Sequence, residues 1–432
     1  MKRTIKLAVV AALALGATSA FATNGSIMIG VGAKSRGMGG TGIGVGHGAE
    51  SGYSNPALIT SIKGNNEISF GATAFMPDIK TTNGSNLNFT QLGGPDLGDE
   101  TSTGTSAGDL YPVPTVSLAS KISDNVYIGF GMWGTGGMGV DFRTDTVGGL
   151  MKMVTALQVM EFGAPMAYTT NNFTIGITPI AQYSSLDIDY KMSAGLQNGF
   201  ALSHGQAPTA TQPYGVGSGT AQDIAFGFNI GIAYEISNFT MGAVYKSEIE
   251  MDFDDVLSNS INPMLGGAAT YDNSKLSTPS QYGVGLSYAM QGHTIAVDYK
   301  HINWEDAETY KDFGWEDQDV IAIGYEYATD AWAVRCGYQY AKSAVQDNTG
   351  KNLRLDTFVP NLTNTFNALG FPGSQETHIT FGGTYAFNET ISMDMAATYG
   401  LENKETVKNF LGQDITNEHS ETGYTVQVNY KF

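Results

Sequence analysis

Alternation of large apolar residues with small or polar ones, repeated in many segments, is the feature of this sequence that most limits its fold. In residues 224–235, the even positions carry isoleucine, phenylalanine or tyrosine, and the odd positions carry alanine, glycine, asparagine or glutamate. A period of two is typical of a β-strand whose two faces meet different surroundings. The same pattern recurs at residues 282–290, 332–341, 378–385 and 424–432.

The length and polarity of these segments point to lipid rather than water. Each has about ten residues or more, which is the length that a tilted strand needs to cross a bilayer. Large, often aromatic side chains share one face, and small or polar side chains share the other. That order is inverted for a soluble barrel and correct for one whose outside faces lipid. A soluble sandwich rarely needs so long a meander, and a propeller would show a blade repeat, which we do not find.

The connections between the segments alternate between short and long. The short ones carry the Asx and Gly residues of tight hairpins and lie at 123–125, 170–172, 237–238, 291–292, 329–330 and 388–389. The long ones lie near 78–110, 136–151, 192–220, 254–276, 305–317, 345–374 and 401–418. Short turns on one side and long loops on the other are typical of outer-membrane barrels. We therefore predict an all-β fold, a 14-stranded antiparallel transmembrane β-barrel over residues 63–432.

The first 22 residues are typical of a secretory signal peptide. Three cations precede a short apolar run, and Ala20-Phe21-Ala22 has the small-x-small form of a cleavage site. We expect cleavage after Ala22, export, and insertion into the outer membrane of a Gram-negative bacterium.

Charge and cysteine content exclude some partners and linkages. Loss of the three leader cations changes the formal net charge from −19 to −22. Such an acidic balance argues against nucleic acid as a partner. Cys336 is the single cysteine, so an intramolecular disulfide is excluded. We expect extensive hydrogen bonding or a large core to hold the chain instead.

Residue patterns typical of catalysis or metal binding do not stand out. The six histidines are scattered, without a His-x-x-x-His or His-Cys cluster. The acidic pairs Asp187/Asp189 and Asp254-Asp255 lack the spacing of a calcium-binding loop. We expect that the protein is not an enzyme and uses no cofactor or metal.

Residues 23–62 differ from all that follows, because they are glycine-rich and poor in branched apolar runs. Glycine at this density allows positive φ and close backbone contact, but it makes a poor free-standing domain. Such a segment is either a flexible linker or a compact insert held by surrounding walls. The predicted barrel supplies walls, so we interpret residues 23–62 as an N-terminal hatch that plugs the lumen. Asn55-Pro56-Ala57 would be its fixed corner.

Strand parity places charged residues of both signs in the barrel lumen. Two interpretations stay open. The charges can form a salt-bridged lining that fixes the shape of the barrel, or one cation can pair with the carboxylate of an amphipathic substrate. The cations are Lys246, Lys300 and Arg335, and the carboxylates are Asp298, Glu326 and Asp394.

Several long loops carry apolar residues, which at an aqueous surface need an explanation. Either the loops pack on one another and cap the barrel, or they form an apolar surface that collects hydrophobic molecules. The candidate capture residues are Met192, Leu196, Phe200, Leu202, Phe253, Val256, Leu257, Ile261, Met264 and Leu265.

The stretch from Gly30 to Gly48, followed by Ser54-Asn55-Pro56-Ala57-Leu58-Ile59-Thr60, resembles the hatch of the FadL/TodX family of outer-membrane transporters of hydrophobic compounds. Asn-Pro-Ala followed by leucine, here Asn55 to Leu58, is the best short mark of that family. Pro112-Val113-Pro114 and the glycine-broken segment 129–134 agree with the resemblance. The chain length, the strand count and the terminal Phe432 agree with it as well.

The resemblance implies a plugged barrel rather than an open pore. Substrate would be caught on the apolar loops and would move to a lumen pocket next to the hatch. A change in the N-terminal segment, together with an inward kink of the third strand, would open a sideways exit into the bilayer. Gly129, Gly131 and Gly134 are candidates for this kink and lateral gate, because glycine inside a strand weakens the ladder.

We therefore predict passive uptake of hydrophobic compounds, first of all long-chain fatty acids. Aromatic hydrocarbon uptake, a surface adhesion or structural barrel, and an open porin are the alternatives. Further expected partners are outer-membrane lipid, lipopolysaccharide and the barrel-assembly machinery, which would recognise the alternating C-terminal strand ending at Phe432. We expect no nucleic acid partner, and we expect a monomer.

Deletion of residues 24–51 tests the hatch interpretation. We expect an assembled barrel that leaks small polar solutes, because the strands would close without the plug. Solute flux into liposomes measures the leak. A deletion variant as tight as the intact protein would show that this stretch is not the seal.

Overall fold

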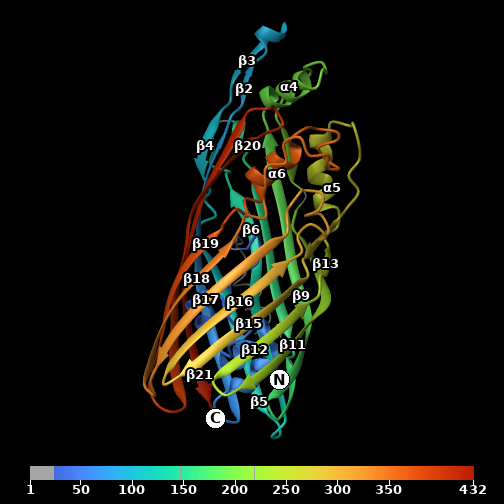
Figure 1. Cartoon of the computed structure of the whole chain (residues 1–432). Coiled ribbons are helices and arrows are strands. Elements are labelled where there is room, and N and C mark those ends of the chain that lie inside the picture. Colours follow the sequence, from blue (N-terminus) through green and yellow to red (C-terminus); the bar gives the residue numbers. More distant parts are fainter. Residues whose placement is uncertain (1–23, 146–147, 218) are drawn as a thin grey trace, which may run out of the picture.

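The computed structural model describes residues 24–145, 148–217 and 219–432, so the predicted leader and its cleavage site lie outside the described residues. The chain forms one closed antiparallel barrel with long loops at one end and short turns at the other (Figure 1). Closure is made by the first and last strands, which pair from Glu67 opposite Lys431 to Asn83 opposite Ile415. The predicted fold class is confirmed.

Fourteen wall strands follow one another around the barrel. They are β1 (Asn66–Asn83), β5 (Tyr111–Lys121), β6 (Val126–Asp141), β7 (Val154–Gly163), β9 (Phe173–Met192), β11 (Ala221–Ile236), β12 (Phe239–Lys246), β15 (Gln281–Met290), β16 (His293–Ile302), β17 (Gln318–Ala328), β18 (Trp332–Ala341), β19 (Thr377–Ala386), β20 (Ile391–Lys408) and β21 (Asp414–Lys431).

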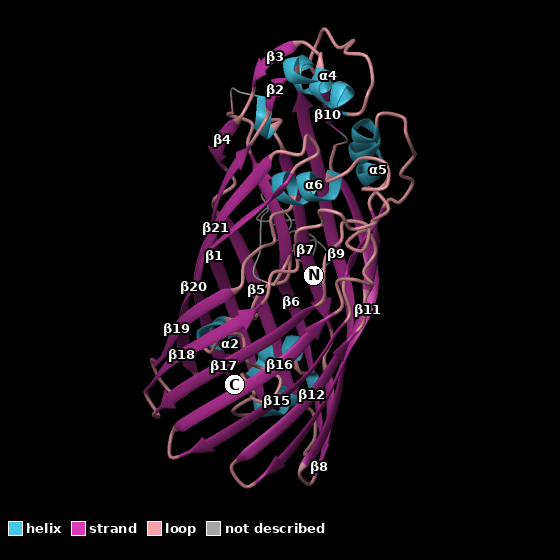
Figure 2. Cartoon of the chain, turned by 45° about the horizontal axis from the view of Figure 1, so that its top comes forward, coloured by secondary structure: helices cyan, strands magenta, loops and turns pink. Residues whose placement is uncertain are grey.

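Three short strands each extend a wall strand and pair with one of that strand's neighbours. β4 (Ser102–Thr105) extends β5, β8 (Met166–Thr170) extends β7, and β10 (Tyr214–Gly217) extends β11. The loops add two hairpins, made by β2 (Asn86–Asn88) with β3 (Asp96–Asp99) and by β13 (Ile249–Asp252) with β14 (Lys275–Thr278). They also carry the helices α4 (Ala194–Ser203), α5 (Val256–Ile261) and α6 (Leu362–Gly370) and the short turns η3 (Thr90–Leu92), η4 (Gly148–Leu150) and η5 (Asn262–Leu265). Figure 2 shows the three helices gathered at the loop end of the barrel.

One predicted loop is wrong. Residues 401–418 were expected to form a long connection, but β20 and β21 pair as far as Lys408 opposite Asp414, which leaves a turn of residues 409–413. In this part of both strands the outward-facing residues are polar, so the apolar alternation that indicates a strand in lipid is absent there. The backbone ladder does not need that alternation, and it continues.

The outward face of the barrel carries the large apolar side chains that the sequence pattern predicts. Phe226 is 76% exposed, Phe381 61% and Tyr424 55%, and each belongs to a row of apolar residues on its strand. Polar residues of the same strands, such as Asn229 and Thr380, are buried in the lumen. A barrel with this polarity is stable only with lipid around it.

The hatch lies inside the turn end of the barrel (Figure 1). It is built from the short helices α2 (Ala33–Gly37) and α3 (Ser51–Ser54) and the turns η1 (Gly48–Glu50) and η2 (Pro56–Ser61). Most residues from 24 to 59 are buried. Such short helices have little stability alone, so the barrel wall must hold them.

A row of lumen-facing wall glycines receives the hatch backbone. At each, an added Cβ would come within 3.0 Å of a hatch atom. We name this row the glycine belt, and it consists of Gly176, Gly231, Gly242, Gly285, Gly324, Gly337 and Gly382. Glycine at these sites lets two backbones approach closely, which explains why small residues dominate the inward face there.

Gly337→Ala tests whether the glycine belt seats the hatch. A Cβ at Gly337 would collide with the backbone of Met38 and Gly39, so the hatch must shift away from β18. We expect a barrel that still assembles, seen as a heat-modifiable band in gel electrophoresis, but that passes small sugars in liposome swelling. Gly215→Ala in β10 is the matched control, because a Cβ there meets open space. If both variants stay equally tight, the belt is not the seat of the hatch.

Candidate functional site

The Asn-Pro-Ala motif forms a fixed corner of the hatch. The Asn55 side chain accepts a hydrogen bond from the Ala57 N–H at 3.0 Å and so caps η2, and Pro56 occupies the first position of that turn. The Asn55 amide also donates to the backbone carbonyls of Ile43, at 2.9 Å, and of Ile232 in β11, at 3.1 Å. One buried side chain thus joins two parts of the hatch to the wall.

Leu58, the residue after this motif, packs with Ala57 against the wall. Both are buried and contact Ala233 of β11. All four predicted hatch-motif residues therefore lie at one joint between the hatch and the barrel.

A second joint uses Asp298 of β16, whose carboxylate accepts three hatch backbone N–H groups. These come from Gly42 at 2.7 Å, Ile43 at 2.8 Å and Gly44 at 3.2 Å. Charge-assisted bonds of this kind are stronger than neutral ones. Strand parity placed Asp298 in the lumen, but the sequence carried no sign that its partner would be backbone rather than a cation.

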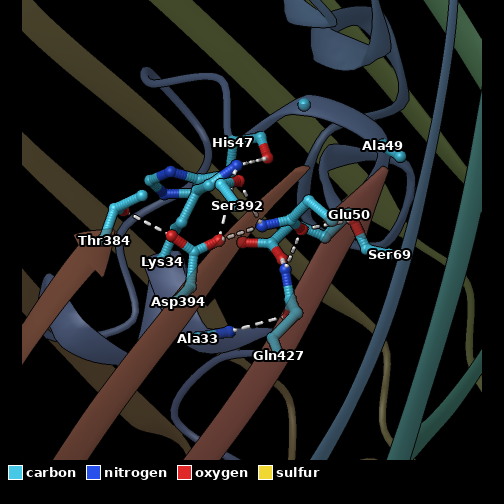
Figure 3. A network of polar contacts seen from close by, with 12 residues as sticks. Ala33, Lys34, His47, Ala49, Glu50, Ser69, Thr384, Ser392, Asp394 and Gln427 are labelled. Carbon is cyan, nitrogen blue, oxygen red and sulfur yellow. Dashed lines mark hydrogen bonds and ion pairs between the residues drawn. The ribbon is translucent and has the colours of Figure 1, made fainter. Parts of the chain in front are cut away.

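A third joint is a polar network between the hatch and strands β19 to β21 (Figure 3). The ammonium of Lys34 lies 3.8 Å from the Asp394 carboxylate. Gln427 donates to the Glu50 carboxylate at 2.6 Å and accepts from the Ala33 N–H at 3.1 Å. Burial raises the pKa of Glu50 to about 7. The hatch is therefore held by polar bonds on several sides of the barrel.

The wall itself is interrupted between β5 and β6. These strands pair from Lys121 opposite Tyr127 to Thr115 opposite Trp133, and the ladder stops there although β6 continues to Asp141. We name the unpaired stretch, residues 111–114 of β5 and 134–140 of β6, the wall break.

Residues 24–29, which we name the N-terminal segment, use the free edge of β6. The Met28 N–H donates to the Thr135 carbonyl at 3.0 Å, and the Gly137 N–H donates to the Ser26 carbonyl at 2.9 Å. Ile27 lies opposite Gly136 in the resulting bridge. The start of the hatch thus replaces β5 as the partner of β6.

The upper half of β6 bends into the lumen. From Trp133 to Val140 every residue is buried, whereas the residues of other wall strands alternate between buried and exposed. The register against β7 shifts between Gly134 and Gly136. Residues 133–140 are therefore covered on both faces, and this half of β6 departs from the regular pattern of the wall.

The three predicted gate glycines have different surroundings. Gly134 borders the register shift, and a Cβ there would come within 2.5 Å of Val113 across the wall break. Gly129 and Gly131 lie lower, in regular pairs with β5. Gly131 leaves room for the inward indole of Trp133, so packing rather than a weakened ladder accounts for it.

Met28 fills the wall break from inside. Its side chain is buried and clusters with Phe75 of β1 and with Tyr111 and Val113 of β5. Apolar packing, together with the two backbone bonds of the N-terminal segment, is what closes the wall at this point.

A cavity of about 50 Å³ lies beside the N-terminal segment. Ile27, Met28 and Ile29 form one side of it, and both predicted lumen lysines, Lys246 and Lys300, reach it. The further lining residues are Gly30, Gly40, Gly42, Ile43, Tyr53, Ser54, Asn229, Val244, Gln281 and Tyr282.

The two lysines of this cavity are not equivalent. Lys246 pairs with the buried Glu161 carboxylate at 3.0 Å, and its ammonium lies 3.8 Å from the centre of the Tyr53 ring. Within the part of the chain that the structure describes, Lys300 has no carboxylate within 4.0 Å and no hydrogen-bond partner. Only Lys300 therefore offers the cavity an ammonium that is free of a protein partner.

Arg335, the third predicted lumen cation, lies outside this cavity. Its guanidinium pairs with Glu326 at 2.6 Å and lies 3.7 Å from Asp394. The salt-bridged interpretation of the lumen charges therefore describes Arg335 and Lys246, and the second interpretation stays open for Lys300.

The predicted capture residues form a cap rather than an exposed surface. Those of the loop after β13 are all buried, as are Met192 and Leu196, while Phe200 and Leu202 are half-buried. Most of them belong to one large apolar cluster that includes α5, α6 and the inward part of β6. Of the two alternatives drawn from the sequence, the loops packing on one another is the one observed.

An aromatic cage from the loop after β16 holds the start of the N-terminal segment. Trp304, Tyr310 and Trp315 lie with their ring centres 4.5 to 4.9 Å apart, and the two indoles border Gly25. The Tyr310 hydroxyl donates to the Ser26 hydroxyl at 3.3 Å. Sequence analysis missed this cage, although four aromatic residues among residues 304–315, in and next to a predicted loop, could have indicated it.

Within residues 24–145, 148–217 and 219–432, we find no group of three His, Cys, Asp or Glu side chains placed to hold a metal ion. In the same described residues, the helices are all too short or too polar to span a bilayer.

Comparisons with known proteins agree with this geometry. Residues 8–432 match the family described as outer membrane protein transport protein (OMPP1/FadL/TodX). The chain is 26% identical, over 386 residues, to a long-chain fatty acid transport protein of Escherichia coli O6:H1, covering 80% of this chain and 79% of that one.

Two crystal structures share the fold. A Pseudomonas aeruginosa FadL homologue superposes with a TM-score of 0.69 at 15% identity, covering 94% of this chain and all of the other. The toluene transporter TodX of P. putida superposes with a TM-score of 0.65 at 18% identity, covering 93% and 99%.

The match spans nearly the whole chain, and the relatives are transport proteins rather than enzymes. A closed barrel with an apolar exterior and an internal hatch agrees with a family of outer-membrane transporters of hydrophobic compounds. The chain belongs to the FadL/TodX family of outer-membrane transport proteins.

Proposed function

We propose that this protein takes up long-chain fatty acids by passive diffusion, with capture at the loop cap, a stop in the cavity beside the N-terminal segment, and exit through the wall break. The observation that carries the proposal is Lys300, an unpaired ammonium in a cavity that is otherwise lined largely by apolar and small residues. Such a site matches one carboxylate joined to an apolar chain.

The electrostatic contribution of Lys300 is large enough to matter. A hydrogen bond to a charged group is worth about 1.5–3 kcal/mol, which corresponds to roughly 10- to 100-fold in affinity. Lys246 is already neutralised by Glu161, so it adds little attraction for a second carboxylate. Lys300 is therefore the residue that would favour a fatty acid over a neutral hydrocarbon.

Entry through the loop cap is supported by its composition. Most of the predicted capture residues on and around α4 and α5 lie in one apolar cluster, whose residues also line a small apolar cavity. That cavity is lined by Leu257, Leu276, Tyr310, Phe313, Trp315 and Phe371. Tyr310 and Trp315 also belong to the aromatic cage, so apolar side chains link the cap to the start of the N-terminal segment.

Exit is supported by the weakness of the wall at the wall break. Two backbone hydrogen bonds and the Met28 side chain close it, whereas a regular pair such as β16 and β17 is joined by an uninterrupted ladder. Movement of the N-terminal segment would remove all of these contacts together. An apolar chain leaving there would enter the membrane directly and avoid the polysaccharide layer outside.

Aromatic hydrocarbons are the second candidate substrate, and the aromatic cage is what favours them. Trp304, Tyr310 and Trp315 can stack on a ring-shaped ligand. A neutral ring gains nothing from Lys300, so the two substrate classes depend on different residues.

We also propose that the protein works as a monomer embedded in outer-membrane lipid and lipopolysaccharide. The assembly machinery would recognise β21, whose Tyr430 ring stacks on that of the terminal Phe432 with centres 5.3 Å apart.

Lys300→Gln tests the substrate class. We expect uptake of labelled oleate to fall about 10-fold or more, because a charge-assisted hydrogen bond is lost. Uptake of labelled hexadecane, which has no charge, should stay unchanged. Lys404→Gln is the control, since Lys404 is exposed and pairs with Glu418 on the outer face. Equal losses for both ligands would remove Lys300 from carboxylate recognition, and no uptake by the wild type would remove the transport proposal itself.

A disulfide across the wall break tests the exit. Met28→Cys with Val113→Cys, in a Cys336→Ala background, should tie the N-terminal segment to β5 within one side-chain cluster. We expect the oxidised protein to stop transporting oleate and the reduced protein to transport it again, because Met28 could no longer move. The single Met28→Cys variant is the control. Uptake at the wild-type rate with the disulfide closed would mean that substrate leaves elsewhere.

A further inference from the structure

Arg36, in hatch helix α2, is a cation whose surroundings differ from those of the other buried charges. It is 1% exposed, and within the described residues no carboxylate lies within 4.0 Å of its guanidinium. One terminal nitrogen lies 3.8 Å from the Met28 sulfur, and the other donates to the Thr398 hydroxyl at 3.4 Å. The Nε–H has no partner.

A buried guanidinium with so few partners is unusual. Its five N–H donors match the two oxygens of a carboxylate, and burying such a charge without an acceptor is unfavourable. Arg335, in the same lumen, has the normal arrangement with two carboxylates. The surroundings of Arg36 are therefore those of an anion-binding group whose anion is not a residue of the protein.

Glu421 of β21 is the carboxylate of the protein that acts electrostatically on Arg36. Burial lowers the pKa of Arg36 to about 10, and the charge of Glu421 acts in the opposite direction. The Glu421 carboxylate is instead committed to His378, at 2.6 Å, and its second oxygen has no partner. Glu421 thus reduces the cost of the buried cation from a distance without occupying its donors.

Met28 contacts Arg36 and also borders the proposed route of the substrate. One part of its side chain lines the cavity that contains Lys300. Its sulfur touches the guanidinium, and the same side chain packs on Tyr111 and Val113 at the wall break. A displacement of Met28 that opens the wall break would therefore uncover Arg36 in the same step.

We propose that Arg36 is a second carboxylate site, exposed only when the N-terminal segment moves, which receives the substrate head group from Lys300 at the exit. This inference rests on the proposed function. It gives the carboxylate two cations in succession, Lys300 in the cavity that Met28 lines and Arg36 against the Met28 sulfur, so the charge stays neutralised while the apolar chain enters the lipid. A neutral hydrocarbon would pass the same opening without using Arg36.

The test separates binding from transport. Arg36→Met keeps the length of the side chain and removes its charge, and Arg36→Lys keeps the charge. We expect Arg36→Met to lower oleate uptake at least 10-fold, to leave hexadecane uptake unchanged, and to leave equilibrium binding of oleate to the purified protein within 2-fold of wild type. Arg36→Lys should recover part of the uptake. Lys300→Gln, in contrast, should lower both binding and uptake of oleate.

Glu421→Gln is the matched control, because it changes the same cluster while keeping the hydrogen bond to His378. We expect oleate uptake to stay within 2-fold of wild type, since Glu421 does not occupy the Arg36 donors. A heat-modifiable band confirms assembly of each variant.

Three outcomes would overturn the proposal. Equal losses of oleate and hexadecane uptake in Arg36→Met would show that Arg36 only supports packing. Equal losses of oleate uptake in Arg36→Met and Glu421→Gln would show that it serves Glu421. A loss of oleate binding in Arg36→Met as large as in Lys300→Gln would place it in the entry cavity. Failure of the wild type to transport either ligand would instead refute the function on which the inference rests.

Discussion

Inside a lipid bilayer every backbone N–H and C=O must find its partner within the protein, and the rest of this structure depends on that constraint. Closure of β1 on β21 satisfies it for the barrel as a whole. The ladder of backbone hydrogen bonds is interrupted between β5 and β6. Two backbone hydrogen bonds, made by residues 26 and 28, give β6 a partner there. The segment that plugs the lumen is therefore also part of the wall. Under the proposed mechanism, movement of this segment would open the wall toward lipid.

The lumen charges divide according to their partners. Asp298 is satisfied by three hatch N–H groups, Arg335 by two carboxylates and Lys246 by Glu161, and these groups hold the hatch and the wall in place. Among the residues that the structure describes, Lys300 and Arg36 have no such carboxylate partner; Lys300 shares a cavity with Met28, and Arg36 contacts the Met28 sulfur. Buried charges that are paired stabilise one arrangement, whereas an unpaired buried charge is unfavourable until an anion reaches it. This difference is the basis for proposing a ligand-binding role for Lys300 and Arg36 and a structural role for the other cations.

Much of the fold followed from the sequence, and so did part of the site. Strand number, wall polarity and hatch came from the period of two and the glycine content, because both report surroundings that are local to each residue. The prediction was wrong at residues 401–418, where the hydrogen-bonded strands continue beyond the segment with apolar alternation. It could not distinguish Gly131, which makes room for Trp133, from Gly134, which borders the bend.

The sequence by itself determined that this chain is a plugged outer-membrane barrel, because side-chain alternation, hairpin chemistry and the Asn55-Pro56-Ala57 corner act within a few residues of the chain. Only the tertiary structure decided which of the described cations lack a carboxylate partner, where the ladder between wall strands is interrupted, and that Met28 reaches both the Lys300 cavity and the wall break. Those properties depend on distances between groups far apart in the chain, such as Met28 and Lys300, and such distances are set by barrel closure and hatch docking, which no local pattern records.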